Sequence, residues 1–230
     1  MAVHTVERIE NLPERTSDAN VVVVDVLTAS TSIVALLDQG ARYVRPFVDA
    51  DAARAFGREH EDAVLVGEEQ GAPLSGFDLV PLPARFRQAD LNDRPVGIRT
   101  TNGTRAIDRA SDAAGVFVGS TVNAGAVADT LAGRDSDSYL VAAGQRGTPS
   151  PEDTAGVNLV EAHYRNRLDG AERASIRRQI AESPVAVWLR ELGLGGEVDA
   201  VLGFDSTRTV PRLRDGVFVP DESGSARSTH

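Results

Sequence analysis

The chain repeats one pattern four times: a short β-branched run, a loop of small polar residues, and then an amphipathic segment. Strands that alternate with helices require crossover connections, which make the strands parallel. A strand that is apolar throughout, such as 21–24, is typical of a sheet covered on both faces. The sequence therefore predicts an α/β fold with a largely parallel sheet and helices on both faces. The runs lie at 21–24, 96–98, 116–118 and 139–141, and the segments that follow at 31–39, 105–110, 124–131 and 152–167.

The remaining segments add less regular structure. Residues 50–60 predict a helix, 64–66 a short strand, and 171–192 one or two helices interrupted by Pro184. The stretch 67–83 is rich in Gly and Pro and predicts an ordered loop. Because no repeat or low-complexity linker interrupts the chain, one domain is expected over 1–220, with room for two lobes. The small polar residues of 221–230 predict a disordered tail.

The charge balance excludes one class of partner. Asp and Glu number 34 against 24 basic residues, the net charge is -10, and every basic residue is Arg. Nucleic-acid binding depends on surplus positive charge, which this chain lacks. An acidic surface without Lys favours a halophilic protein, because molar salt screens its self-repulsion. A GC-rich genome that encodes Arg in place of Lys is the alternative explanation.

Several catalytic classes are also excluded. The chain has no Cys, which removes disulfides, thiolate metal sites and a cysteine nucleophile. None of its four His residues falls in a polar loop, so neither a Ser-His-Asp triad nor a zinc helix is expected. Without Lys there is no GxxxxGK[ST] phosphate loop. Asp25 lacks the second Asp of the Asp-x-Asp pattern found in haloacid dehalogenases. The acidic N-terminal segment and the lack of a long apolar run predict a soluble, cytoplasmic protein without a membrane partner.

Polar loops that follow parallel strands line the ligand crevice of such sheets. Carboxylates stand in or near these loops: Asp25 after the first strand, Glu68 after 64–66, and Asp78 further on. Mg²⁺ needs only a few hard oxygen ligands and keeps several waters. Asp25 is the strongest candidate, since an unpaired charge at the end of a buried strand is costly. Glu152 and Asp153 open the fourth helix, where acidic residues favour the helix dipole with or without a metal.

The loop 101–105 offers two hydroxyls, an amide, a glycine and a guanidinium at the start of a predicted helix. Free N–H groups at a helix N-terminus attract anions, and Arg105 could bind two oxygens of a phosphate. An N-capped turn would use the same residue types without any ligand. Taken alone, the loop leaves both interpretations open.

Together, these loops resemble the 2-phosphosulfolactate phosphatase (ComB) family. The resemblance runs in order from about residue 20 to 160, with a last match at 210–211. Its most specific part is the sequence Thr-Thr-Asn-Gly-Thr-Arg-Ala at 100–106. The other matching motifs are Val23-Val24-Asp25-Val26-Leu27, Ala29-Ser30-Thr31, Gly67-Glu68, Gly76-Phe77-Asp78-Leu79, Gly119-Ser120, Asn123, Ala143-Gly144, Arg146-Gly147, Glu152-Asp153 and Ala155-Gly156.

The resemblance implies a Mg²⁺-dependent phosphatase that converts 2-phospho-3-sulfolactate to sulfolactate and phosphate, a step towards coenzyme M. The partner would be a small anionic phosphate ester, and a homo-oligomer is left open. The chemistry of the loops places Mg²⁺ on Asp25 and Asp78, with Glu68 or Asp153 nearby, as the metal and catalytic residues. The expected substrate-binding residues are Ser30, Thr31, Thr101, Asn102, Gly103, Thr104, Arg105, Ser120, Asn123, Arg146 and Gly147.

Three positions depart from the family pattern. Thr28 and Glu69 stand where the family usually has Arg. Val80-Pro81-Leu82-Pro83 stands where the family usually has Gly-Asn-Ser-Pro. Because charge-assisted bonds to anions are the strong ones, these changes predict weaker binding of a second anionic group. Arg99 and Arg146 could compensate. A non-catalytic anion- or metabolite-binding relative of the same fold is the alternative function. A nucleotide-binding regulator would be a third, but the chain lacks a glycine fingerprint.

Overall fold

The computed structural model describes residues 1–145 and 147–222, and within this part of the chain all strands join one ten-stranded sheet. The strand order is β1-β8-β2-β7-β9-β10-β3-β6-β4-β5. The strands are β1 (Val3–Val6), β2 (Asn20–Val24), β3 (Tyr43–Pro46), β4 (Val64–Glu69), β5 (Ala72–Pro73), β6 (Pro95–Arg99), β7 (Gly115–Gly119), β8 (Ser138–Ala142), β9 (Pro211–Arg214) and β10 (Val217–Pro220).

The sheet consists of two parallel blocks. Strands β1, β8, β2 and β7 form one block, and β3, β6 and β4 form the other. The hairpin β9–β10 lies between them and pairs antiparallel with β7 on one side and with β3 on the other. Three successive antiparallel pairings separate β7 from β3, so the two blocks run in opposite directions. The predicted α/β fold with a mostly parallel sheet is confirmed, with this hairpin as an addition.

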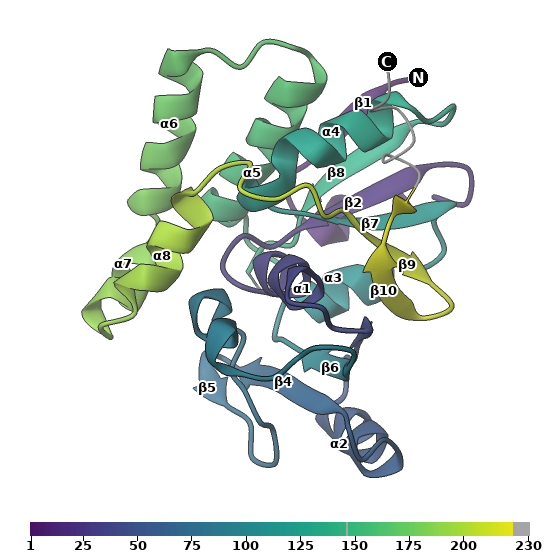
Figure 1. Ribbon diagram of the computed structural model, residues 1–230. Helices are drawn as coiled ribbons and strands as arrows, with labels where there is room; N and C mark the ends of the chain where they lie inside the picture. The colour runs from purple at the N-terminus through teal and green to yellow at the C-terminus, as the bar shows by residue number, and fades with distance from the viewer. Residues whose placement is uncertain (146, 223–230) are drawn as a thin grey trace, which may run out of the picture.

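Helix α1 (Ala29–Asp38) lies between the two blocks (Figure 1). It contacts β7, β9, β10 and β3, and its side chains Ile33 and Leu36 are fully buried. One apolar cluster therefore includes Val21 of the first block, α1, and Val64 and Val96 of the second. Both blocks share this core. The sheet thus curls around α1, and loops from both blocks can reach the N-terminal end of this helix.

Other helices cover the outer faces. α4 and α5 pack on the first block through Val22, Val24 and Phe117, and α2 packs on β4 and β6. Helices α6, α7 and α8 form an arm to one side (Figure 1). No helix in the described ranges is long and apolar enough to cross a membrane. The helices are α2 (Ala50–Glu59), α3 (Gly103–Arg109), α4 (Ala124–Ala132), α5 (Pro151–Tyr164), α6 (Gly170–Ala181), α7 (Pro184–Glu191) and α8 (Gly195–Leu202), and the short 3-10 turns are Ile9–Asn11, Pro83–Gln88 and Thr121–Asn123.

The predicted helices are all present, with ends that shift by a few residues. Gly40 follows the C-cap of α1 with φ 86°, as a glycine in that position predicts. The pattern missed the elements that are short or contain charged residues, namely β1, β3, β5, β9, β10 and α8. Asp221 begins the tail that we predicted to be disordered, yet its carboxylate accepts a hydrogen bond from Arg134 at 2.7 Å. Residues 223–230 lie outside the described residues, so the prediction stays open there.

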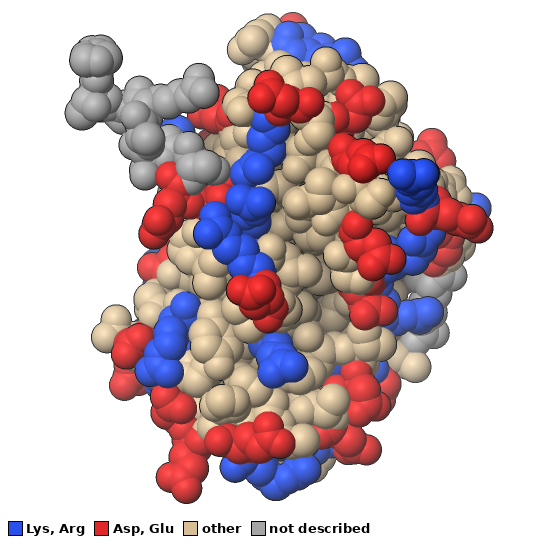
Figure 2. Space-filling view, turned by 90° about the vertical axis from the view of Figure 1, so that its right-hand side faces the viewer, with Lys and Arg blue, Asp and Glu red and all other residues tan. Residues whose placement is uncertain are grey.

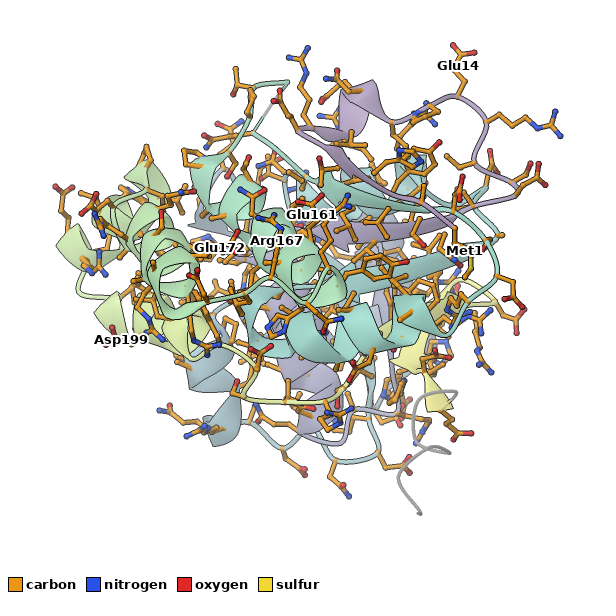
Figure 3. All side chains as sticks on the ribbon, turned by 90° about the horizontal axis from the view of Figure 1, so that it is seen from above. Met1, Glu14, Glu161, Arg167, Glu172 and Asp199 are labelled. Carbon is orange, nitrogen blue, oxygen red and sulfur yellow. The ribbon has the colours of Figure 1, made fainter. Side chains whose placement is uncertain are left out.

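Ion pairs are spread over the surface. Arg167 lies at the α5–α6 corner between Glu161 and Glu172, at 2.9 and 2.6 Å (Figure 3). On the face shown in Figure 2, acidic and basic side chains are interspersed rather than gathered by sign. Local pairs of this kind leave the excess of ten negative charges uncompensated.

We expect the melting temperature to rise with salt. At net charge -10, the negative charges repel one another and destabilise the folded state, and molar KCl screens this repulsion. Salt also weakens exposed ion pairs, but these contribute only about 0–1 kcal/mol each to the free energy of unfolding, so the net effect should be stabilising. The measurement is a series of thermal melts from low to molar KCl at constant pH. Equal melting temperatures would contradict the halophilic prediction and favour genome composition as the reason for the missing Lys.

Candidate active site

The loops that follow β2 and β6 meet at the N-terminal end of α1. Gly103, the first residue of α3, packs directly against Ala29 and Asp25. A Cβ atom at position 103 would lie 2.6 Å from Oδ2 of Asp25, closer than any ordinary contact. Only glycine therefore allows this approach. Residues from opposite blocks of the sheet come together here because the sheet curls around α1.

Asp25 is the buried carboxylate at the centre of this junction. Its Oδ1 accepts a hydrogen bond from the Ala29 amide at 3.2 Å, and its own amide donates to Oγ of Ser30 at 2.8 Å. Burial raises the pKa of Asp25 to about 6, with further contributions from the negative charges of Glu152 and Glu68, while the Ala29 bond acts in the opposite direction. Asp25 is thus a carboxylate whose charge the fold disfavours, which is common at functional sites.

Two further carboxylates enter from the first turn of α5. Asp153 accepts hydrogen bonds from the amide of Val26 at 2.8 Å and from that of Gly144 at 3.2 Å, one on each oxygen. Burial, then the charges of Asp25 and Glu152, raise its pKa well above the usual range. Glu152 is 3% exposed, and its Oε2 has no hydrogen-bond partner among the described residues. A buried carboxylate oxygen without a protein partner is a position at which a water molecule or a cation can bind.

Glu68 connects the end of β4 to the loop after β6. Its Oε1 accepts from the amide of Thr101 at 2.6 Å, and its Oε2 accepts from the Thr101 hydroxyl at 3.0 Å and from the amide of Gly71 at 2.7 Å. Both oxygens are therefore used to hold loops of the second block. Glu68 is close enough to Asp25 to raise its pKa, but its hydrogen bonds indicate a positioning role.

A cavity of about 530 Å³ opens at the loop that follows β6, and Asp25, Glu152 and Asp153 are not among its lining residues. Arg99 forms an ion pair with Glu69 at 2.9 Å and donates to the carbonyl of Glu68 at 2.7 Å, while its buried Nε has no partner among the described residues. Arg105 is exposed and makes no ion pair within the described part of the chain. The exposed guanidinium of Arg105 suits an anionic ligand, whereas the unpartnered Nε of Arg99 is buried. The cavity is lined by Glu10, Glu69, Gln70, Arg99, Thr101, Arg105 and Gly147.

Several residues that we expected to bind substrate instead hold the loops together, because their hydrogen bonds close within the protein. Thr31 and Ser120 share a bond of 2.6 Å, Asn123 accepts from the Ser120 amide at 2.8 Å, and Thr104 donates to the carbonyl of Thr100 at 2.7 Å. Ser30 donates to the carbonyl of Val23 at 3.2 Å. All five are buried, at 2% exposure or less. The residues concerned are Ser30, Thr31, Thr104, Ser120 and Asn123.

Of the other residues predicted to bind substrate, some line the cavity and others do not. Thr101, Arg105 and Gly147 line the cavity, and Gly103 lies against Asp25. Asn102 is half-buried at the N-cap of α3, without a side-chain cap bond. Arg146 lies outside the described residues.

Asp78 does not join the carboxylates, contrary to our expectation. It is exposed, its Oδ2 accepts from the Leu65 amide at 2.8 Å, and it lines a second cavity with Phe77 and Arg85. It is not among the charges that raise the pKa of Asp25 or Asp153. The reason is local: Asp78 pairs with the backbone of β4 three residues before Glu68, away from the strand end.

The donor set suits a magnesium ion bound by few protein ligands. Within the described residues, no three His, Asp or Glu side chains are grouped closely enough to hold one metal ion, so the expected set of Asp25, Asp78, Glu68 and Asp153 is not assembled. Mg²⁺, however, usually takes one or two carboxylates and completes its shell with water and substrate phosphate. Asp25 and the unpartnered Oε2 of Glu152 fit that requirement, whereas Asp153 and Glu68 are engaged by backbone amides.

The raised pKa of Asp25 makes a prediction about stability. Its folded-state pKa of about 6 lies above its ordinary value of 3.8, so the folded protein binds the proton more tightly, and stability is lost as pH rises between these values. In buffer that contains a metal chelator at pH 7, Asp25→Asn should therefore have a free energy of unfolding about 1–3 kcal/mol higher than that of wild type. Urea unfolding at pH 4.5 and pH 7 measures this. A variant less stable than wild type at pH 7 would contradict it.

The chain is similar to known proteins over most of its length. The family model of 2-phosphosulpholactate phosphatase matches residues 3–216. A "Probable 2-phosphosulfolactate phosphatase" of Deinococcus radiodurans is 32% identical, covering 93% of this chain and 95% of its own. Proteins with the same name from Thermotoga petrophila (33%; 87% and 92% covered) and Clostridium beijerinckii (26%; 85% and 89%) are also similar.

By class, these findings place the chain among the phosphoric monoester hydrolases. It belongs to the 2-phosphosulpholactate phosphatase family. The resemblance seen in the sequence is thereby confirmed, and the match extends well beyond residues 20–160.

Sequence reasoning missed some residues of the site. Glu152 was not in the expected ligand set, because a first-turn acid favours the helix dipole with or without a metal, and its burial and unpartnered oxygen are seen only in the fold. Glu10 and Gln70 line the cavity from segments without a recognisable motif. Gln70 adopts φ 54°, which no local signal predicted.

Proposed function

We propose that this protein is a Mg²⁺-dependent phosphatase that hydrolyses 2-phosphosulfolactate or a related phospho-hydroxy acid. The observation that carries the proposal is the group of buried carboxylates at Asp25, Glu152 and Asp153, which Gly103 connects by its close contact with Asp25 to the loop 101–105. That loop lines a cavity together with Arg99. Metal-ligating oxygens beside cations are what a phosphoryl group requires for binding and charge stabilisation. The family's name supports the substrate class.

Asp25 and Glu152 would hold Mg²⁺, and the bound ion would polarise a phosphoryl oxygen and neutralise charge that develops on it. The ion would also offset the burial and the neighbouring negative charges that raise the pKa of Asp25. Asp153 fixes the backbone of Val26 and Gly144 on either side of the site.

The cavity residues would bind and orient the ester. Arg105, which has no ion pair in the described part of the chain, is the available charged donor. The nitrogens of Arg99 are buried or bonded to Glu68 and Glu69, so Arg99 would contribute mainly its charge. The Thr101 hydroxyl is already committed to Glu68, so Thr101 acts by shaping the loop. A cytoplasmic location and a place in coenzyme M biosynthesis remain predictions.

The test is phosphate release from 2-phosphosulfolactate and from p-nitrophenyl phosphate, with Mg²⁺ and with EDTA. Turnover that requires Mg²⁺ supports the proposal. Binding of 2-phosphosulfolactate by calorimetry without turnover of either ester would instead favour the non-catalytic relative. Equal rates in Mg²⁺ and EDTA would remove the metal from the proposal.

The Glu69–Arg99 ion pair predicts the substrate preference. Because Glu69 neutralises one of the two cavity cations, a second anionic group is weakly held, and phospholactate should be hydrolysed at least as well as 2-phosphosulfolactate. Glu69→Gln should raise kcat/KM for the sulfonate by about 10-fold, since a charged hydrogen bond contributes roughly 1.5–3 kcal/mol. Glu10→Gln, in the same cavity without that pair, is the matched control. A strong wild-type preference for the sulfonate would refute this.

A further inference from the structure

Trp188, the only tryptophan of the chain, connects the arm to the second block of the sheet. It lies on α7, and its ring covers Gly71 in the turn between β4 and β5. A Cβ atom at Gly71 would lie 2.7 Å from Cη2 and 3.3 Å from Cζ2 of the indole. The side chain is nevertheless 43% exposed, so its ring is not a core element of the arm.

The covered turn forms part of the cavity wall. Gln70 lines the cavity, and its amide donates to Oγ1 of Thr101 at 2.8 Å, while the Gly71 amide donates to Oε2 of Glu68 at 2.7 Å. Both turn residues have positive φ, 54° and 82°. The residues of β5 that follow are exposed. The turn is thus held by two hydrogen bonds on its inner side and by the indole on its outer side.

The same helix also reaches the first block. Ala186 and Leu189 of α7 form a small apolar cluster with Val198 of α8, and Leu27 packs against it. Leu27 lies two residues after Asp25. α7 therefore contacts both the loop that carries the central carboxylate and the turn that closes the cavity.

We propose that Trp188 is a positioning residue that presses the β4–β5 turn against Glu68 and Thr101 and so keeps Glu69 and Gln70 in the substrate-binding wall. The proposal rests on the proposed function in that the cavity is taken as the substrate site. Without the indole, a turn with two positive-φ residues loses the apolar group that covers Gly71 and opens more often. Opening of the wall should weaken substrate binding more than the chemical step.

Hydrogen exchange tests whether Trp188 holds the β4–β5 turn, and it requires no substrate. In Trp188→Ala, exchange of the Gln70 and Gly71 amides should be at least ~10-fold faster than in wild type, as expected when local opening becomes easier. Val187→Ala, which removes an equally exposed side chain (43%) from the same helix, should leave these amides unchanged. Trp188→Phe should restore most of the protection. Unchanged exchange in Trp188→Ala, or equal acceleration in Val187→Ala, would overturn the proposal.

Steady-state kinetics tests whether the position of this turn affects substrate binding. With the ester that wild type hydrolyses best, Trp188→Ala should raise KM about 10-fold with kcat within about threefold, the pattern of lost binding that is common to ground and transition states. Trp188→Phe should return KM towards wild type. An unchanged KM, or a fall in kcat alone, would refute the role. If wild type releases no phosphate at all, the proposed function fails, and the exchange experiment still decides whether Trp188 holds the turn.

Discussion

Asp25→Asn is expected to lower kcat for phosphate release by at least ~100-fold, because charge stabilisation at the reacting group is usually the largest catalytic term. The amide keeps the shape of the carboxylate and can still accept the hydrogen bond from Ala29, so the variant should fold. Glu152→Gln should have a similar effect, since its unpartnered Oε2 is the second ligand that we propose for Mg²⁺. Steady-state kinetics over a range of Mg²⁺ concentrations measures both variants.

Asp78→Asn provides the matched control. Asp78 is an exposed carboxylate bonded to the Leu65 amide, and it lines the other cavity. We expect kcat within about threefold of wild type, because it touches neither reacting atoms nor their ligands. A ~100-fold loss in Asp78→Asn with normal activity in Asp25→Asn would reverse the assignment and support the ligand set first expected from the sequence.

Gly103→Ala should be the most disruptive small substitution. The new methyl group would lie 2.6 Å from Oδ2 of Asp25 and also overlap Ala29, so the loops after β2 and β6 must separate. Overpacking of this kind costs about 1–3 kcal/mol, which corresponds to a fall of several degrees in melting temperature for a chain of this size. We expect kcat to fall by more than the loss of folded protein explains, because the substitution displaces Asp25, the central carboxylate. Thermal melts and kcat at a temperature where both proteins are folded measure the two effects.

Gly196→Ala is the control for that substitution. Gly196 lies in α8, and a Cβ there would meet nothing within 4 Å. Alanine in a helix with open space is neutral or stabilising by about 0.4–1 kcal/mol. If Gly196→Ala and Gly103→Ala had equal effects, the close approach of the two loops would not matter to the fold.

The sequence predicted the elements of the fold well because each long element is encoded locally. The apolar run of β2 and the start of α5 at Pro151, Glu152 and Asp153 can each be recognised from a few consecutive residues. The hairpin β9–β10 was missed because its strands are only four residues long and β9 contains Arg212 and Arg214. Its place between β7 and β3 depends on pairing between residues more than ninety positions apart in the sequence. Strand direction across the sheet follows from that hairpin and could not be predicted either.

The candidate site was predicted in part for the same reason. Asp25 stood out because a charge directly after four buried valines requires a special environment. Glu152 and Asp153 are neighbours with equal local signals, and only the fold shows that amides occupy Asp153 while Glu152 keeps an unpartnered oxygen. Hydroxyl residues such as Ser120 and Thr31 serve equally well as ligands or as internal hydrogen-bond donors, so residue type could not separate the two roles.

The position of the β9–β10 hairpin also bears on biosynthesis. Residues 211–220 are among the last described residues to leave the ribosome, yet they complete the middle of the sheet. Until they emerge, β7 and β3 each have an unpaired edge, and such edges invite pairing with other chains. A nascent chain of this protein would therefore carry two unpaired strand edges while residues 120–210 are synthesised. Stop codons shortly before position 211 should yield aggregates rather than a smaller folded enzyme.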